Sequence, residues 1–425
     1  MNRKGLPMVS LDRRTVLRTG AGLGVVAAAG AVAGYELLGS RSTPEPWHPP
    51  APVRAAAPDR RRLLVIEMAG GSDGLSMTVP YTDSRYRDLR RRTAIAAEHV
   101  HALDDRLGLH PHLSKLAASG VAVVPGVGIA KPDLSHFEML YRWQTGNPEG
   151  LIRADTGFLG RLCDHLGDPS APAVGVALGV GSSQALACER VTTLSVDSGN
   201  DGLFPVFDDE NVRDAWLAAQ RAMAHPDRTD APSFATARAG TAAALRFSDV
   251  AATLTPAGDG YPHSDLGIQL RLAARLLADD NHGLRIVHVP MGADFDTHTK
   301  HPGRYEKLMK DLDDSLAAFR TDLARRGMAD RVLIAAYSEF GRRVPDNDSD
   351  GLDHGAAGTA LLLGPVNPGV FGEQPSLRAL DADDNLRATV DMTEFYATLA
   401  ESWFGVPATD VLPGSPRPLP GVVAA

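Results

Sequence analysis

The clearest indication of the fold in this chain of 425 residues is LLVIEM at residues 63–68, followed directly by AGGSDG at residues 69–74. A short, mostly apolar run that ends in glycines is typical of a strand buried on both faces of a parallel sheet, with a loop behind it. Similar runs recur along the chain, at residues 121–124, 284–289, 332–336 and 360–363.

Helical patterns separate these runs. Residues 265–278 place their leucines on one side, residues 305–326 repeat Leu and Phe at spacings of three and four, and residues 209–224 also show a helical pattern. Strand and helix in alternation predict an α/β fold, with a doubly wound, mostly parallel sheet and helices on both faces. Residues 155–262 are less regular. We expect an inserted subdomain there, either lying over the site or a structural elaboration.

The first forty residues predict a twin-arginine signal peptide. Arg13 and Arg14 precede an uncharged run of Gly, Ala, Val and Leu at residues 20–34, which is the order of a basic and then an apolar signal region. Because that run is short and interrupted by glycine, we expect cleavage rather than a retained anchor, and only an uncleaved signal would link the chain to a membrane. A Pro-rich linker at residues 41–60 leads into a domain expected over residues 61–425.

The charge balance disfavours a nucleic-acid partner. After residue 50 the chain carries 37 basic and 49 acidic residues, a net charge of about −12, whereas phosphate backbones demand a basic surface. The two cysteines, Cys163 and Cys188, are too few for a disulfide scaffold, and they either pair in an oxidising compartment or remain buried thiols.

Metal-binding residue types follow several predicted strands. The carboxyl ends of parallel strands share one edge of a sheet, so we expect these side chains to converge there. Carboxylates with one or two imidazoles suit zinc, manganese, magnesium or calcium, and one or two such ions would clamp an oxyanion. The candidate ligands are Asp73, Asp296, His298, Glu339, Asp353 and His354.

Each of these residues, taken alone, also has a structural interpretation. Asp73 beside glycines is a common turn residue, and His354 could be an ordinary loop histidine. Glu339 could pair with Arg342, and we prefer that role for Arg342 over oxyanion binding. Only the recurrence of such residues after successive strands favours a metal site.

Five motifs, in this order, resemble the exported family catalogued as domain of unknown function 1501. The resemblance covers most of residues 62–405. That family is in turn similar to the alkaline phosphatase and sulfatase superfamily, whose members hold metal at the edge of a doubly wound sheet and attack with a Ser, Thr or modified Cys at a helix start. The motifs are GGSDGL at 70–75, LSHFEMLYRWQTG at 134–146, DFDTHTKHPGRYEKLMKDLDDSLAAFRTDL at 294–323, SEFGRR at 338–343 and DHG at 353–355.

The resemblance to the superfamily implies metal-ligand roles and also shows a departure. Glu339 stands where the superfamily has an Asp-His pair, but Phe340 follows it, so one histidine ligand is missing. Asp353 or His301 would replace it. This departure leaves room for a different metal, a single metal or an inactive site. The matching ligand positions are Asp73, Asp296, His298 and His354.

Ser135 and His136 are the predicted catalytic residues. Ser135 begins the helical stretch at 134–146, which resembles the superfamily's nucleophile helix. Free N–H groups at a helix start favour an anion, and a metal would lower the pKa of the hydroxyl. Alternatively, Ser135 only caps the helix, with Glu138 completing a capping box. The two roles of Ser135 can coexist. His136 has three possible roles of its own, as a ligand, as an acid or as a histidine packed on the core.

The sequence is compatible with two functions. The first is an exported metal-dependent hydrolase or transferase that acts on phosphate or sulfate esters. The second is a non-catalytic exported protein that keeps the alkaline phosphatase-like fold and binds a ligand, a metal or an envelope partner. Either would be delivered outside the cytoplasm or to the cell envelope by the twin-arginine translocase, and would meet a small-molecule ester or an envelope ligand. Export of an already folded protein favours the first function.

Overall fold

The computed structural model describes residues 50–150, 154–196, 209–225, 232–251, 254, 256–280, 283–291 and 294–424. The predicted signal peptide at 1–40 and the linker before residue 50 lie outside the described residues. Within the described ranges, no helix combines the length and the apolar character needed to cross a membrane. The regular structure opens with the short 3₁₀-helix η1 (Pro58–Arg60).

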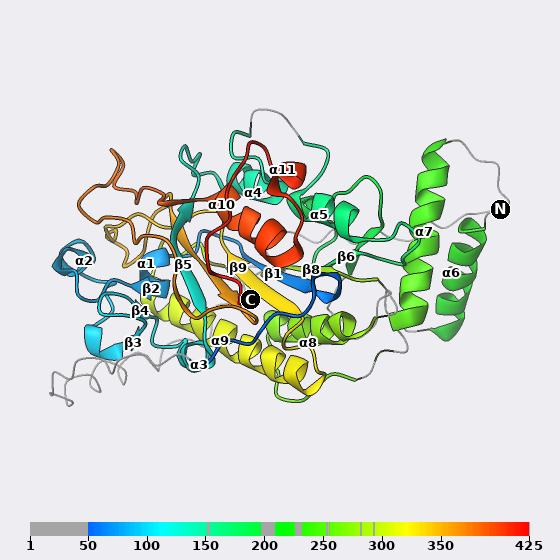
Figure 1. Ribbon diagram of the computed structural model, residues 1–425, viewed down its shortest axis with the longest axis horizontal. Coiled ribbons are helices and arrows are strands. Elements are labelled where there is room, and N and C mark those ends of the chain that lie inside the picture. The colour runs from blue at the N-terminus through cyan, green and yellow to red at the C-terminus, as the bar shows by residue number, and fades with distance from the viewer. Residues whose placement is uncertain are drawn as a thin grey trace, which may run out of the picture. The chain divides into compact units, whose positions relative to one another are not determined.

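A nine-stranded sheet organises the chain (Figure 1). Its strands are β1 (Arg62–Met68), β5 (Ala122–Gly128), β6 (Gly175–Leu178), β7 (Thr193–Val196), β8 (Ile286–Met291), β9 (Val332–Tyr337), β10 (Gly358–Leu363), β11 (Gly369–Val370) and β12 (Val390–Asp391). The order is β11-β5-β10-β9-β1-β8-β6-β7, and β12 also pairs with β5. Neighbouring strands are parallel except at β10, which runs antiparallel to both β9 and β5.

The five predicted strands and the α/β class are confirmed. Every residue of β1 is buried, as the apolar run at 63–68 predicts, and β1 pairs with β8 on one side and β9 on the other. Strands β6 and β7 come from the segment expected to form an insertion, residues 155–262, yet they extend this same sheet. All four residues of β6 are buried and β6 pairs directly with β8, so this part of the segment belongs to the core.

Helices cover both faces of the sheet (Figure 1). One core contains Leu64 and Ile66 of β1, and the other contains Leu63 and Val65, because successive side chains of a strand point to opposite faces. The first core includes residues of α3 (Ser114–Ser119), α8 (Asp265–Ala278) and α9 (His301–Arg325). The second includes residues of α4 (His136–Thr145), α5 (Phe158–Leu166), α10 (Met392–Ala397), the π-helical η4 (Thr398–Phe404) and α11 (Ala408–Val411).

The remaining elements are short or lie outside the main sheet. Helices α6 (Glu210–Met223) and α7 (Pro232–Ala251) pack against each other. A small second sheet consists of β2 (Thr78–Val79), β3 (His101–Ala102) and β4 (Gly108–Leu109). Cys163 and Cys188 are free thiols, and Cys163 is buried. The other short helices are α1 (Gly74–Met77), α2 (Ser84–Leu89), η2 (Ala97–His99) and η3 (Gln184–Leu186).

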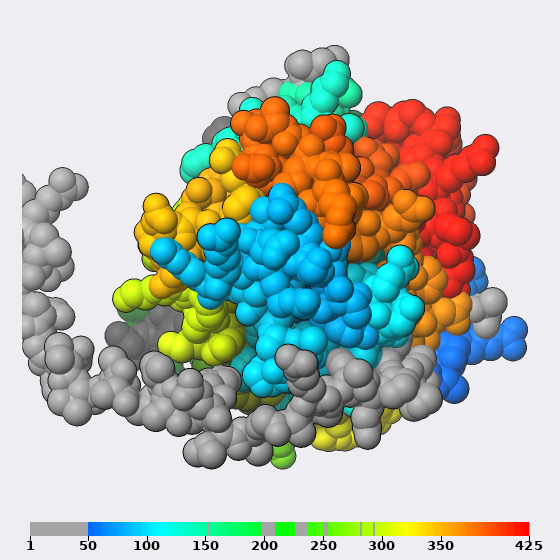
Figure 2. All heavy atoms as spheres, turned by 90° about the vertical axis from the view of Figure 1, so that its left-hand side faces the viewer, coloured from blue at the N-terminus to red at the C-terminus, as the bar shows by residue number. Residues whose placement is uncertain are grey.

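A third apolar cluster packs the loops at the carboxyl edge of the sheet against one another. It joins Leu75 and Tyr86 to Val344 and Leu386. Figure 2 shows this face, where the blue residues around α2 lie beside the orange residues ahead of β12. The parallel strands β1, β5, β8 and β9 all end at this edge and the antiparallel β10 begins there, so five segments of the chain meet.

Candidate metal centre

Three imidazoles and one carboxylate converge at the carboxyl edge of the sheet. His136 is the first residue of α4, Asp296 and His298 precede α9, and His354 precedes β10. The Nε2 atom of His354 lies 3.1 Å from Nε2 of His136 and 2.9 Å from Nε2 of His298. Asp296 Oδ1 lies 3.3 Å, 3.0 Å and 3.6 Å from the Nε2 atoms of His354, His298 and His136. The group His136, Asp296 and His354 could hold a metal ion, and His298 adjoins it.

The outer nitrogen of each ring determines which nitrogen faces the centre. His354 Nδ1 lies 2.8 Å from the carbonyl oxygen of Leu134, which can only accept, so Nδ1 carries a proton and donates it. His298 Nδ1 likewise donates to Asp353 Oδ1 at 3.0 Å. In a neutral imidazole the opposite nitrogen then carries the lone pair. Both Nε2 lone pairs therefore face the centre.

Glu339 orients the third ring in the same way. His136 Nδ1 donates to Glu339 Oε1 at 2.7 Å, and this hydrogen bond raises the pKa of His136. The Glu339 carboxylate is fully buried and is itself held by the Gly70 N–H at 2.9 Å and by the Ser338 hydroxyl at 2.9 Å. Glu339 and Asp353, predicted as ligands, thus contact the outer ring nitrogens and fix the orientation of the imidazoles.

This donor set fits a single divalent cation. Lone pairs about 3 Å apart repel one another unless a proton or a cation lies among them. A four-coordinate ion with bonds of about 2.0–2.1 Å separates its ligand atoms by about 3.3 Å, close to the distances from 2.9 to 3.6 Å found here. Metal-bound histidines usually donate their other N–H to a carboxylate or carbonyl, as all three rings do.

Arg342 connects the loops around the centre. Its buried guanidinium pairs with Asp296 Oδ1 at 2.6 Å. Burial raises the pKa of Asp296, but Arg342 together with His298 and His136 outweighs that effect, and the pKa lies below its usual value. The predicted pairing of Arg342 with Glu339 is wrong, because Glu339 is already held by other donors. Arg342 also donates to the carbonyl oxygens of Gly71 at 2.7 Å, Leu352 at 3.0 Å and Phe295 at 3.2 Å.

Asp73, the predicted first ligand, belongs to a different network. Arg90 donates to both of its oxygens, at 2.6 and 2.8 Å, and the Ser76 N–H donates to Oδ2 at 2.9 Å, which caps α1. Burial raises the pKa of Asp73, but the charge and hydrogen bonds of Arg90 hold it well below its usual range. The Arg90 side chain is fully buried and also donates to the carbonyl oxygen of Val344 at 2.5 Å. A guanidinium therefore compensates the charge of Asp73.

His301, the other suggested replacement ligand, lies in this same buried network. Its Nδ1 lies 2.7 Å from Thr297 Oγ1 and its Nε2 lies 3.0 Å from Ser76 Oγ. Burial lowers its pKa to about 4, so it is neutral at physiological pH. The third imidazole of the centre is supplied by His136, and Phe340 packs its ring 4.8 Å from that imidazole.

Ser135 is the N-cap residue of α4, directly ahead of His136. Its side chain makes no capping hydrogen bond with the described residues, and Glu138 instead pairs with Arg142 at 2.8 Å. The predicted capping box is therefore wrong. Leu134, one residue earlier, has a φ of 63°, which is strained for a residue with a side chain. That strained residue supplies the carbonyl oxygen that orients His354.

The fold and the site define an α/β protein with a histidine-rich candidate metal centre at the carboxyl edge of its sheet. The chain belongs to the family described as protein of unknown function (DUF1501), whose model matches residues 60–404, which confirms the resemblance in the motifs. No curated protein matches the sequence.

Three solved structures illustrate what the chain is similar to. The lipoteichoic acid synthase LtaP from Listeria monocytogenes is 9% identical, over 83% of this chain and 74% of that one, with a TM-score of 0.39. The C-terminal periplasmic domain of EcEptC from Escherichia coli, in complex with Zn, is 11% identical over 86% and 92%, with a TM-score of 0.39. The PsFucS1 sulfatase from Pseudoalteromonas sp. is 13% identical over 84% and 73%, with a TM-score of 0.36. At such scores the fold class rests on the strand order of the sheet alone.

Proposed function

We propose that this protein is an exported metal-dependent hydrolase or transferase that acts on phosphate or sulfate esters. The observation that carries the proposal is the convergence of three Nε2 atoms and one carboxylate oxygen, with every outer ring nitrogen already bonded to an acceptor. A bound divalent cation would stabilise negative charge on an ester oxygen as a Lewis acid. Nitrogen-rich sets of four donors suit zinc best. The proposed ligands are His136, Asp296, His298 and His354.

We propose one ion rather than two. Asp73 is the further ligand that the resemblance to the superfamily implies, but both oxygens of its carboxylate accept hydrogen bonds from Arg90. Arg90 and Asp73 are both completely buried. Displacing the guanidinium would leave a charge in the interior without a partner, which is strongly unfavourable.

Ser135 is the proposed nucleophile. It lies at the N-terminus of a ten-residue helix, next to the proposed ligand His136. The free N–H groups of the first helical turn favour the negative charge of a phosphoryl or sulfuryl group. In the proposed reaction, the serine oxygen loses its proton and bonds to phosphorus or sulfur, while the bond to the ester alcohol breaks and that alcohol leaves with a proton. Water or a second alcohol then takes the transferred group, which breaks the bond to the serine oxygen, and the proton lost by the acceptor returns to the serine.

The Ser135→Ala variant tests this function. With zinc loaded, the wild-type protein should hydrolyse a 4-nitrophenyl phosphate or sulfate ester, and Ser135→Ala should lose that turnover while its bound metal stays unchanged. Ser135→Asn should be equally inactive, because a nucleophile needs the hydroxyl itself. Ser114→Ala, at the start of α3 on another part of the fold, serves as the control. Turnover that survives in Ser135→Ala would assign the attack to water, and metal binding without any turnover by the wild type would favour the non-catalytic binding protein.

We propose that the twin-arginine translocase exports the protein. After export, its partner would be a small-molecule ester or an envelope ligand, and not a nucleic acid. The paired change of Arg13 and Arg14 to lysine should leave the precursor in the cytoplasm, about forty residues longer than the mature protein, because that pathway reads the arginine pair. Immunoblots of cell fractions measure this directly. Normal secretion of the double lysine variant would contradict the proposed route.

A further inference from the structure

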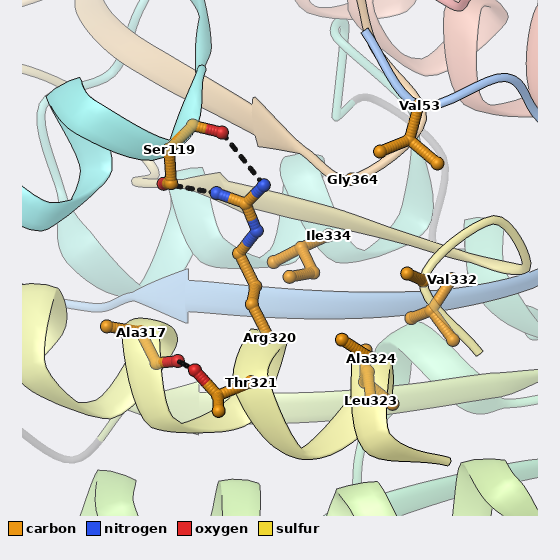
Figure 3. A pocket seen from close by; sticks show the side chains of 11 residues that line it. Val53, Ser119, Ala317, Arg320, Thr321, Leu323, Ala324, Val332, Ile334 and Gly364 are labelled. Carbon is orange, nitrogen blue, oxygen red and sulfur yellow. Dashed lines mark hydrogen bonds between the residues drawn. The ribbon is translucent and has the colours of Figure 1, made fainter. Parts of the chain in front are cut away.

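A cavity of about 440 Å³ lies between α9, β9 and the chain that leads into β1 (Figure 3). It is lined by Val332 and Ile334 of β9, whereas the candidate metal centre follows the other end of that strand. Its wall is mostly aliphatic, with Leu323 and Ala324 of α9 and Val53 opposite them. Small-molecule sites have volumes of about 300–1,000 Å³ and combine apolar walls with a few polar groups.

One cationic side chain enters this apolar cavity. Arg320 extends from α9 so that its guanidinium reaches Ser119 at the end of α3 (Figure 3), where it donates to the hydroxyl and, at 2.9 Å, to the carbonyl oxygen. Both acceptors are neutral. Among the described residues, no carboxylate oxygen lies within 4.0 Å of the Arg320 guanidinium.

Two arginines near Arg320, in contrast, have carboxylate partners. Arg326, the C-cap residue of α9, pairs with Asp322 at 2.9 Å, and near the start of β9 Arg331 pairs with Asp280 at 2.7 Å. Burial lowers the pKa of Arg320, and no acidic group offsets this effect. Arg320 is only partly buried, and a negatively charged ligand would supply the carboxylate partner that it lacks.

We propose that the cavity binds a small amphipathic monoanion of the fatty-carboxylate class. Its carboxylate would lie against the Arg320 guanidinium, whose planar array of N–H donors matches a carboxylate. Its alkyl chain would pack on the accessible side chains of Val53 and Ala324 and leave water. The volume of about 440 Å³ fits a medium-length chain, and the site is independent of the proposed ester chemistry.

Calorimetric titration of the full chain with decanoate and with decanol tests the proposal. The wild type should bind one decanoate at least about tenfold more tightly than decanol, since only decanoate carries the charge. Arg320→Gln should weaken decanoate at least about tenfold and leave decanol unchanged. Arg325→Gln removes a charge from the exposed last residue of the same helix, outside the cavity lining, and it should bind both ligands as the wild type does.

A second variant keeps the test independent of the folding of Arg320→Gln. Ala324→Phe would fill the apolar part of the cavity, and it should weaken decanoate and decanol alike. Three results would overturn the proposal: no binding of decanoate by the wild type, equal binding of decanoate and decanol, or unchanged decanoate binding in Arg320→Gln or in Ala324→Phe.

Discussion

Replacing Arg90 by methionine is expected to lower the free energy of unfolding by about 3–5 kcal/mol, because it leaves the Asp73 carboxylate charged and buried without its partner. The pair is fully enclosed, with side-chain exposures of 0% and 1%, so water cannot replace the lost guanidinium. Urea denaturation monitored by tryptophan fluorescence measures the change.

The double variant Arg90→Met with Asp73→Leu is the control for this prediction. Exchanging both charges for apolar groups of similar size should restore most of the stability, since a buried ion pair often contributes little more than apolar packing. A single variant within about 1 kcal/mol of the wild type would contradict the structural role given to this pair.

The pH dependence of stability follows from the lowered pKa of Asp73. A carboxyl group whose pKa is lower in the folded than in the unfolded state stabilises the fold above the unfolded value of about 3.9. This contribution is lost as the pH falls below that value toward the folded pKa. The double variant Arg90→Met with Asp73→Leu should lack this loss of stability in acid. The measurement compares the free energies of unfolding of the wild type and the double variant as the pH is lowered.

Changes at the candidate centre are expected to separate ligands from orienting residues. His354→Ala should abolish zinc binding, because its Nε2 atom lies within 3.3 Å of three other donor atoms. Asp353→Asn should weaken zinc by about 10–100-fold, the usual effect of removing a group that orients a metal-bound histidine. Competition with a chromophoric chelator measures both affinities.

The matched control for these variants is Asp348→Asn. Asp348 lies in the same loop region, but its side chain is fully exposed, so its removal should leave zinc affinity unchanged. Equal affinities of His354→Ala and the wild type would remove His354 from the ligand set.

Much of the fold follows from short-range patterns, but the direction of strands does not. The apolar run at 63–68 and the amphipathic pattern at 265–278 predict β1 and α8, and α8 has those same bounds in the structure. The apolar run at 360–363 predicts a strand, but it does not indicate whether that strand is parallel or antiparallel to its neighbours. Its antiparallel pairing with β9 and β5 depends on where the chain enters the sheet.

The candidate site was only partly predictable for a related reason. Three of the ligand candidates lie beside strand ends at one edge of the sheet, namely Asp296, His298 and His354. Because these strand ends lie at the same edge, the sequence predicts that the three side chains lie close together, as the structure shows. A single histidine at a helix start, such as His136, has the same local pattern whether it is a ligand or packs on the core. Its role emerges from contacts with residues about 200 positions away.

The burial of Arg90 could not be predicted from its local sequence. It lies in the run RDLRRRT at residues 87–93, which reads as a solvated basic segment, and nothing local distinguishes it from Arg91 or Arg92. Tertiary contact with the backbone carbonyls of residues 343 and 344 buries it. That burial places a guanidinium at Asp73, where the sequence pattern predicted a metal.

We expect one divalent cation to be held by His136, Asp296, His298 and His354. Elemental analysis of the purified full-length protein after zinc reconstitution and gel filtration measures the number of bound ions. We expect about one zinc per chain in the wild type and in Asp348→Asn, and close to none in His354→Ala. A wild-type protein that retains no metal, or that retains two ions per chain, would contradict a single-ion site.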